Sequence, residues 1–267
     1  LLSSAFGQPA LDDTLDYKRQ ADGNDYSRNE LENYTLTLDW QLGDNTLTAV
    51  TGYVTYEFED NCDCDYSPAN VFVLPLQEEY EQFSQEVRLT SPGGETVDWI
   101  GGAFFQSNEQ VFDDAIQVTS TSILPAALSA KFGSPIFLDL AGTEAPRHYE
   151  QSSDTWAVFG QATWNMTDSL RATLGARFTQ EKKKGQRSID IASIGGTITP
   201  FTVAAYGALG VETNQGAGHD LKGDRTESAF TPLVNVQWDA TEDMLMTFKY
   251  TYNDFDSDGR NSELTDN

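Results

Sequence analysis

The chain has 267 residues, with 42 acidic against 16 basic side chains and a formal net charge of −26. This balance argues against a nucleic-acid partner, because binding to phosphates requires clustered Lys and Arg. Two cysteines are too few for a disulfide scaffold. The longest apolar run, residues 71–76, falls far short of the roughly 20 residues that a membrane-spanning helix needs.

Alternation of apolar and polar side chains dominates the sequence and predicts antiparallel strands. In residues 170–179, for example, leucine, alanine and phenylalanine alternate with arginine, threonine and glycine, which places the two sets on opposite faces of a strand. The same pattern predicts eight strands at 34–40, 46–58, 81–91, 96–106, 155–165, 170–179, 229–238 and 244–252. The facing of the second and fourth strands is ambiguous.

The connections between these strands alternate between short and long. Tight turns rich in Gly, Asp and Asn are expected at 41–45, 92–95, 166–169 and 239–243. Long polar loops are expected at 59–80, 107–154 and 180–228, and the second contains a helical pattern at Leu124–Phe132. Strands of about ten residues, with short turns at one rim and long loops at the other, are typical of outer-membrane barrels.

The tryptophans support a membrane-spanning sheet. Trp40, Trp99, Trp164 and Trp238 lie beside short turns, whereas Trp156 lies at the long-loop end of its strand. The step from Trp156 to Trp164 corresponds to about 26 Å along a strand, close to the ~25 Å apolar band that aromatic girdles flank in such barrels. A soluble core with tryptophans at its strand ends is the alternative.

Four stretches carry strand–turn–strand patterns: residues 83–94 (FSQEVRLTSPGG), 159–178 (FGQATWNMTDSLRATLGARF), 47–53 (LTAVTGY), and 230–241 with FTP and VQWDAT. Together they resemble the barrel of TonB-dependent outer-membrane receptors, over residues 33–252. The resemblance implies an all-β fold, an antiparallel up-and-down transmembrane β-barrel segment of about eight strands within a larger, 22-stranded barrel. We therefore expect 1–267 to be a partial barrel domain, with loops at 1–32 and 253–267 and four hairpins at 33–252.

The same resemblance implies a transport receptor without enzymatic activity, located in the outer membrane of a Gram-negative bacterium. Such receptors take up scarce nutrients, most often ferric siderophores, with energy passed by TonB. The implied partners are the TonB complex, a ferric siderophore or other small nutrient, and lipopolysaccharide and membrane lipid. The TonB complex would act through a plug domain, which we do not recognise in this sequence. Because charges on a membrane strand are tolerable only toward the lumen, the lumen-facing candidates are Glu86, Arg88, Arg171, Arg177 and Asn235.

An acidic stretch near the end of the chain matches the first half of a calcium loop. Asp254, Asp256 and Asp258 precede Gly259 at the required spacing. The second half departs from the pattern, because Thr265 stands where a bidentate Glu belongs. We therefore expect no resident cofactor, and keep a calcium ion at this loop as the alternative to an ordinary acidic surface.

Two further clusters contain reactive or charged side chains. Cys62 and Cys64 flank Asp63, where two thiolates could hold a soft metal, form a disulfide or stay free. Residues 182–184, all lysine, and Arg187 form a dense basic cluster. On an outer membrane this cluster would meet lipopolysaccharide phosphates, or it begins a solvated loop.

Two other functions are compatible with the sequence. One is a complete small outer-membrane barrel that acts as an adhesin or envelope anchor, and the other is a secreted β-sandwich that binds carbohydrate. The mass of the natural polypeptide and its detergent dependence separate these from a receptor. His148 and His219 lie in separate predicted loops without a nucleophile beside them, so no residue reads as catalytic.

Overall fold

A single antiparallel sheet organises the protein, which we describe from a computed structural model over residues 25–63, 68–216 and 220–252. The strands follow one another in the order β1-β2-β3-β4-β5-β6-β8-β9, and the short β7 pairs with β5. Their bounds are β1 Tyr26–Leu42, β2 Asn45–Cys62, β3 Leu74–Thr90, β4 Val97–Val118, β5 Thr143–Asn165, β6 Leu170–Ile189, β7 Ala192–Ser193, β8 Leu221–Thr241 and β9 Met244–Thr251. This up-and-down order confirms the all-β fold class and the eight predicted strands.

Most strands extend farther toward the long-loop end than the alternation predicts. The first strand begins at Tyr26 instead of residue 34, and the fourth ends at Val118 instead of residue 106. The long loops are accordingly shorter than expected; the one between β4 and β5 covers only residues 119–142. The expectation was wrong here because backbone pairing continues where both faces meet water, and a strand with two polar faces shows no alternation.

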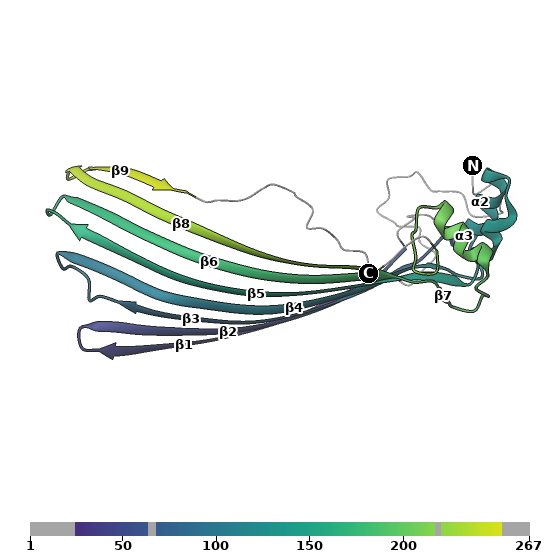
Figure 1. The fold of residues 1–267 in the computed structure, drawn as a ribbon, viewed down its shortest axis with the longest axis horizontal. Coiled ribbons are helices and arrows are strands. Elements are labelled where there is room, and N and C mark those ends of the chain that lie inside the picture. The colour runs from purple at the N-terminus through teal and green to yellow at the C-terminus, as the bar shows by residue number, and fades with distance from the viewer. Residues whose placement is uncertain (1–24, 64–67, 217–219, 253–267) are drawn as a thin grey trace.

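The short turns and the helices lie at opposite ends of the sheet. Figure 1 shows the hairpin turns at one end of a long, curved sheet, and α2, α3 and β7 at the other. The β1–β2 turn uses Gly43 at a φ of 63°, a left-handed conformation that glycine adopts without steric cost. None of the helices in the described ranges is long and apolar enough to cross a membrane.

Three helical segments at the long-loop end pack around a small core together with the adjoining ends of β4 and β5. They are α2 (Leu124–Phe132), η1 (Pro135–Leu140) and α3 (Pro200–Ala208). The helix expected at Leu124–Phe132 is thus confirmed, whereas α3 was not expected. The term loop core denotes the following cluster of buried residues: Val118, Phe137, Leu140, Ala145, Ile191, Ala205 and Tyr206.

The strand register divides the side chains between two faces. We call the face that carries all five tryptophans the apolar face, and the opposite one the polar face. Near the short turns the apolar face carries a band without a charged side chain. This apolar band comprises even positions 34–42, odd positions 47–53, 83–89 and 97–105, and even positions 156–164, 170–178, 230–238 and 244–250.

The register also settles the two strands whose facing the sequence leaves open. In β2, Leu47 and Tyr53 lie on the apolar face, because they pair with Leu89 and Phe83 of β3. In β4, Trp99 lies on that face as well, since it pairs across to an even position of β5.

Candidate functional site

The polar face brings together the five candidate residues from three separate strands. Glu86 pairs with Phe104, which pairs with Ala157, which in turn pairs with Thr179. Directly paired residues share a face, and side chains alternate along each strand. Following the pairs into β8 places Glu86, Arg88, Arg171, Arg177 and Asn235 on the same face.

The charged members of this set differ in their partners. The Arg88 guanidinium lies 2.7 Å from the Glu86 carboxylate, and Arg171 lies 3.4 Å from Asp239. Asn235 has a buried Oδ1 without a hydrogen-bond partner in the described part of the chain. Buried polar atoms usually have a partner, so the Asn235 amide oxygen is an open acceptor on this face.

Arg177 has aromatic partners instead of a carboxylate. Its guanidinium carbon lies 5.5 Å from the ring centroid of Phe104 and 5.8 Å from that of Phe159, within the range of cation–π contacts. Its Nε donates to the Thr179 hydroxyl at 3.0 Å. The two rings and the hydroxyl hold a positive charge in a fixed position on the polar face.

A glycine makes room for one of these rings. A Cβ added to Gly102 would lie 2.6 Å from the Phe159 ring and 2.6 Å from a backbone carbonyl oxygen of β3. Any larger residue at position 102 would therefore displace the Phe159 ring. It would also clash with the backbone carbonyl, which is held in the sheet and cannot move aside as a side chain can.

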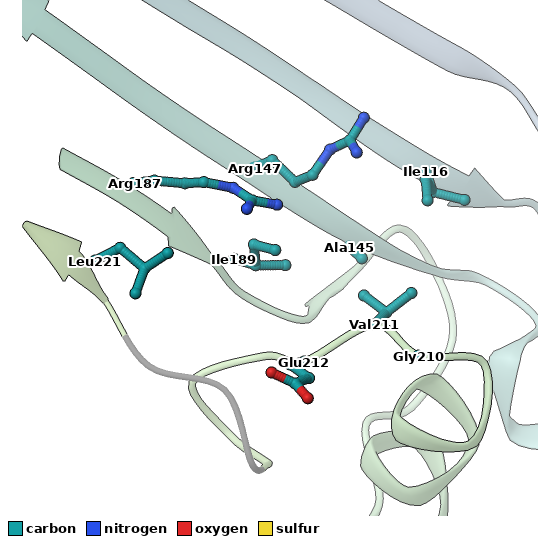
Figure 2. A pocket seen from close by; sticks show the side chains of 9 residues that line it. All are labelled: Ile116, Ala145, Arg147, Arg187, Ile189, Gly210, Val211, Glu212 and Leu221. Atoms are coloured by element: carbon teal, nitrogen blue, oxygen red, sulfur yellow. The ribbon is translucent and has the colours of Figure 1, made fainter. Parts of the chain in front are cut away.

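A pocket of about 250 Å³ lies at the long-loop end of the sheet, where β4, β5, β6 and β8 meet the segment that follows α3. Figure 2 shows its lining: Ile116, Ala145, Arg147, Arg187, Ile189, Gly210, Val211, Glu212 and Leu221. Polar and apolar atoms contribute about equally to the walls, and two arginines and one glutamate supply the charge.

The two arginines come from neighbouring strands and differ in their surroundings. Arg147 forms a two-point ion pair with the Asp114 carboxylate, whose side chain is only 9% exposed. Arg187 pairs in register with Tyr149 and Leu221, and no ion pair or hydrogen bond reaches its guanidinium within the described ranges. Arg147 is thus neutralised locally, whereas Arg187 is available to a ligand.

The segment that carries Glu212 is fixed by the loop core. Gly210 follows the C-cap of α3 with a φ of 78°, and the Val211 amide donates to the Tyr206 carbonyl at 3.0 Å. Two residues past Glu212, the Asn214 amide donates to the Ile189 carbonyl of β6 at 2.9 Å. The pocket is therefore preformed, since the wall that bears Glu212 is anchored on both sides.

The basic cluster predicted at residues 182–184 and Arg187 has a different position from the expected one. The basic cluster lies within β6 and not at the start of a loop, and the register splits it: Lys182 and Lys184 lie on the apolar side of the sheet, Lys183 and Arg187 on the polar side. Lys183 pairs with Glu181 at 3.2 Å.

The cysteine and calcium predictions have different outcomes. Cys62 is disulfide-bonded, so a thiolate metal site or a free thiol at Cys62 is wrong; Cys64 lies outside the described residues. Asp254, Asp256 and Asp258 also lie outside them. Over the ranges that the structure covers, no group of three or more His, Cys, Asp or Glu side chains is arranged to hold a metal ion.

The sequence could not reveal the pocket. Ile116, Arg147 and Glu212 are far apart in the chain, and only the pairing of the strands and the position of α3 bring them together. One signal for α3 was present: Thr199 before Pro200 is a typical helix start, and the Thr199 hydroxyl indeed accepts from the amides of Phe201 and Thr202.

A family model described as TonB dependent receptor-like, beta-barrel, matches residues 2–255. No curated protein sequence matches the chain. Among solved structures, the ferric yersiniabactin uptake receptor FyuA from Yersinia pestis is similar with a TM-score of 0.59 at 14% identity, over 84% of this chain and 28% of FyuA. The siderophore receptor PiuA from Acinetobacter baumannii has a TM-score of 0.52 at 11% identity, over 85% of this chain and 32% of PiuA.

The RagAB peptide transporter has a TM-score of 0.50 at 6% identity, over 79% of this chain and 26% of its own. At these identities the likeness shows the fold alone. The chain spans about a third or less of each of these relatives.

Proposed function

This chain belongs to the TonB-dependent receptor-like β-barrel family, and from this premise we propose that it forms part of an outer-membrane receptor that imports a scarce nutrient. The observation that carries the proposal is the division of the sheet into an uncharged apolar band and a charged polar face. Trp40 is 65% and Trp164 is 55% exposed on this band. Apolar patches of this size in contact with water are rare, and lipid is the environment that suits them.

In this proposal the apolar band faces lipid and the polar face lines the lumen. Glu86, Arg88, Arg171, Arg177 and Asn235 then lie in the barrel interior, where charges are tolerated. The proposed location is the outer membrane of a Gram-negative bacterium, and the protein transports without enzymatic catalysis.

The proposed cargo is a ferric siderophore. FyuA is described as a ferric yersiniabactin uptake receptor and PiuA as a siderophore receptor. In this chain, Arg177 and Arg187 place guanidinium groups without carboxylate partners on the polar face of the described sheet. TonB acts in this proposal through a plug domain of the intact receptor. Lys182 and Lys184, which project from the apolar side beyond the band, would contact lipopolysaccharide phosphates, and the band itself contacts membrane lipid.

The facing of the strands can be tested with two adjacent residues of β3. Cysteine replaces Glu86 or Val87 in the intact receptor, and the membrane-embedded protein is exposed to a charged maleimide, with the receptor that lacks either replacement giving the background labelling. We expect labelling of E86C and protection of V87C, because only the first side chain faces water. Labelling of V87C alone would contradict the proposal.

Transport can be tested in iron-limited cells. Uptake of radiolabelled ferric catecholate, hydroxamate and phenolate siderophores is compared between cells with the intact receptor, cells without it and cells without TonB. We expect at least one siderophore to lose uptake in both deletion strains. If all three enter equally well in every strain, the siderophore assignment fails.

A further inference from the structure

The pocket at the long-loop end holds two side chains of opposite charge that do not neutralise each other. Arg187 projects from β6 and Glu212 from the segment after α3, and both line the same cavity. In Figure 2 the Ile189 side chain lies between the Arg187 guanidinium and the Glu212 carboxylate. No ion pair joins them, and neither side chain has another partner in the described part of the chain.

The other charges at the pocket are already paired. Arg147 lines the pocket, but its guanidinium points away from Glu212 in Figure 2 and is occupied by the Asp114 carboxylate. Among the described residues that line the pocket, one cation and one anion therefore remain without a partner. A ligand with a single charge would satisfy only one of them and would leave the other desolvated, which costs free energy.

Apolar side chains line the pocket beside the two free charges. Leu221 lies opposite Arg187 in the register, Ile189 lies opposite Arg147, and Val211 packs against the loop core. A ligand that fits this lining carries an apolar group near its charges. The cavity volume of about 250 Å³ limits the inserted part to a small group.

We propose that this pocket binds a zwitterionic amino-acid or short-peptide ligand, with its carboxylate on Arg187, its ammonium on Glu212 and an apolar side chain against Ile189 and Leu221. Arg suits a carboxylate because its planar guanidinium donates two parallel hydrogen bonds. The class includes free amino acids, short peptides and larger ligands that display an amino-acid end. This inference rests on the proposed function as a receptor and names the chemistry that the receptor recognises.

The experiment uses the intact receptor purified in detergent and three matched probes. These are leucyl-leucine, its N-acetylated form and its C-terminal amide, and binding is measured by titration calorimetry. We expect leucyl-leucine to bind and each blocked probe to bind at least about tenfold more weakly, because each lacks one charge-assisted hydrogen bond. Equal affinity for all three probes, or no binding of leucyl-leucine at millimolar concentration, overturns the proposal.

Variants assign each charge to one end of the probe. R187Q should weaken leucyl-leucine about tenfold and no longer discriminate against the amide, while E212Q should no longer discriminate against the acetylated form. D224N removes a charge from the other side of β8 and should not change the affinity. The assignment is wrong if D224N weakens binding as much as the pocket variants.

Failure of this inference can be told from failure of the proposed function. If the intact receptor imports a ferric siderophore with TonB but does not discriminate among the three probes, the pocket assignment fails and the function stands. If the probes are discriminated as expected while siderophore uptake is unaffected by receptor deletion, the siderophore function fails and the pocket assignment stands.

Discussion

Replacing Tyr206 with alanine tests whether the loop core is a separate folding unit. Tyr206 is 2% exposed, and its hydroxyl lies 3.1 Å from the Thr143 Oγ1. The single hydroxyl proton of Thr143 is donated to the Leu140 carbonyl at 2.7 Å, so the Tyr206 hydroxyl is the donor to Thr143. Truncation of a buried aromatic ring costs about 3–5 kcal/mol. Loss of the hydroxyl alone, in Y206F, costs about 0.5–1.5 kcal/mol.

These magnitudes decide the outcome because the loop core is small. It is formed by seven buried residues at the long-loop end of the sheet, so its local opening free energy is expected to be at the low end of the range within a protein. We expect Y206A to open residues 119–142 and 190–216 while the strand pairs of the apolar band persist. Y206F should give only a partial increase in opening.

Amide hydrogen exchange of the intact receptor measures this opening segment by segment. Phe201 provides a matched control, since it lies on the same helix but is 60% exposed, and F201A should leave exchange nearly unchanged. Heat-dependent gel mobility reports whether the barrel itself remains folded. Unchanged exchange in α3 of Y206A, or an equal effect of F201A, would refute this reasoning.

Three further outcomes follow from the faces of the sheet and from the loop core. Leu174→Arg places a charge at the middle of the apolar band and should cost about 2–4 kcal/mol of barrel stability, whereas Gln161→Arg on the polar face should be tolerated; urea unfolding in lipid vesicles compares the two. Gly102→Ala should lower the yield of assembled barrel, because its Cβ would lie 2.6 Å from a backbone oxygen, while Gly101→Ala, with 3.7 Å to its nearest neighbour, should assemble normally. Burial raises the pKa of the Tyr206 hydroxyl above its ordinary value of 10.0. The contribution of Tyr206 to loop stability is therefore complete below pH 10.0 and is lost as the pH rises through the raised value. Amide exchange rates of α3 measured against pH test this, and a loss of protection that begins below neutral pH would contradict it.

The strands of the apolar band were predictable because the two faces of the sheet meet different surroundings. A side chain at every second position then reports its environment, as the alternation at 170–179 does. Beyond the band this contrast disappears. The sequence pattern therefore predicts a loop for residues 107–118 of β4, although their backbone pairs with β5 as far as Val118.

The alternation of apolar and polar residues within one strand also cannot establish which side chains of different strands lie on the same side of the sheet. Arg177 and Asn235 each lie on the polar side of their own alternation, but only the register between β6 and β8 places them on one face. The pocket depends still more on long-range pairing, because Arg187 and Glu212 line the same cavity only once α3 has packed into the loop core.

The acidic excess of the chain is compatible with a membrane-spanning sheet because of where the charges lie. On the long-loop side, charged residues follow the band on the apolar face of seven strands. The first of them, taken strand by strand from β1 to β6 and then in β8, are Glu32, Glu57, Glu81, Glu109, Asp154, Lys182 and Asp224. On the short-turn side, Trp40, Trp99, Trp164 and Trp238 lie at or beside the edge of the same band in β1, β4, β5 and β8. The band holds five side chains or fewer on each strand, a height that a bilayer with a ~25 Å apolar band can accommodate.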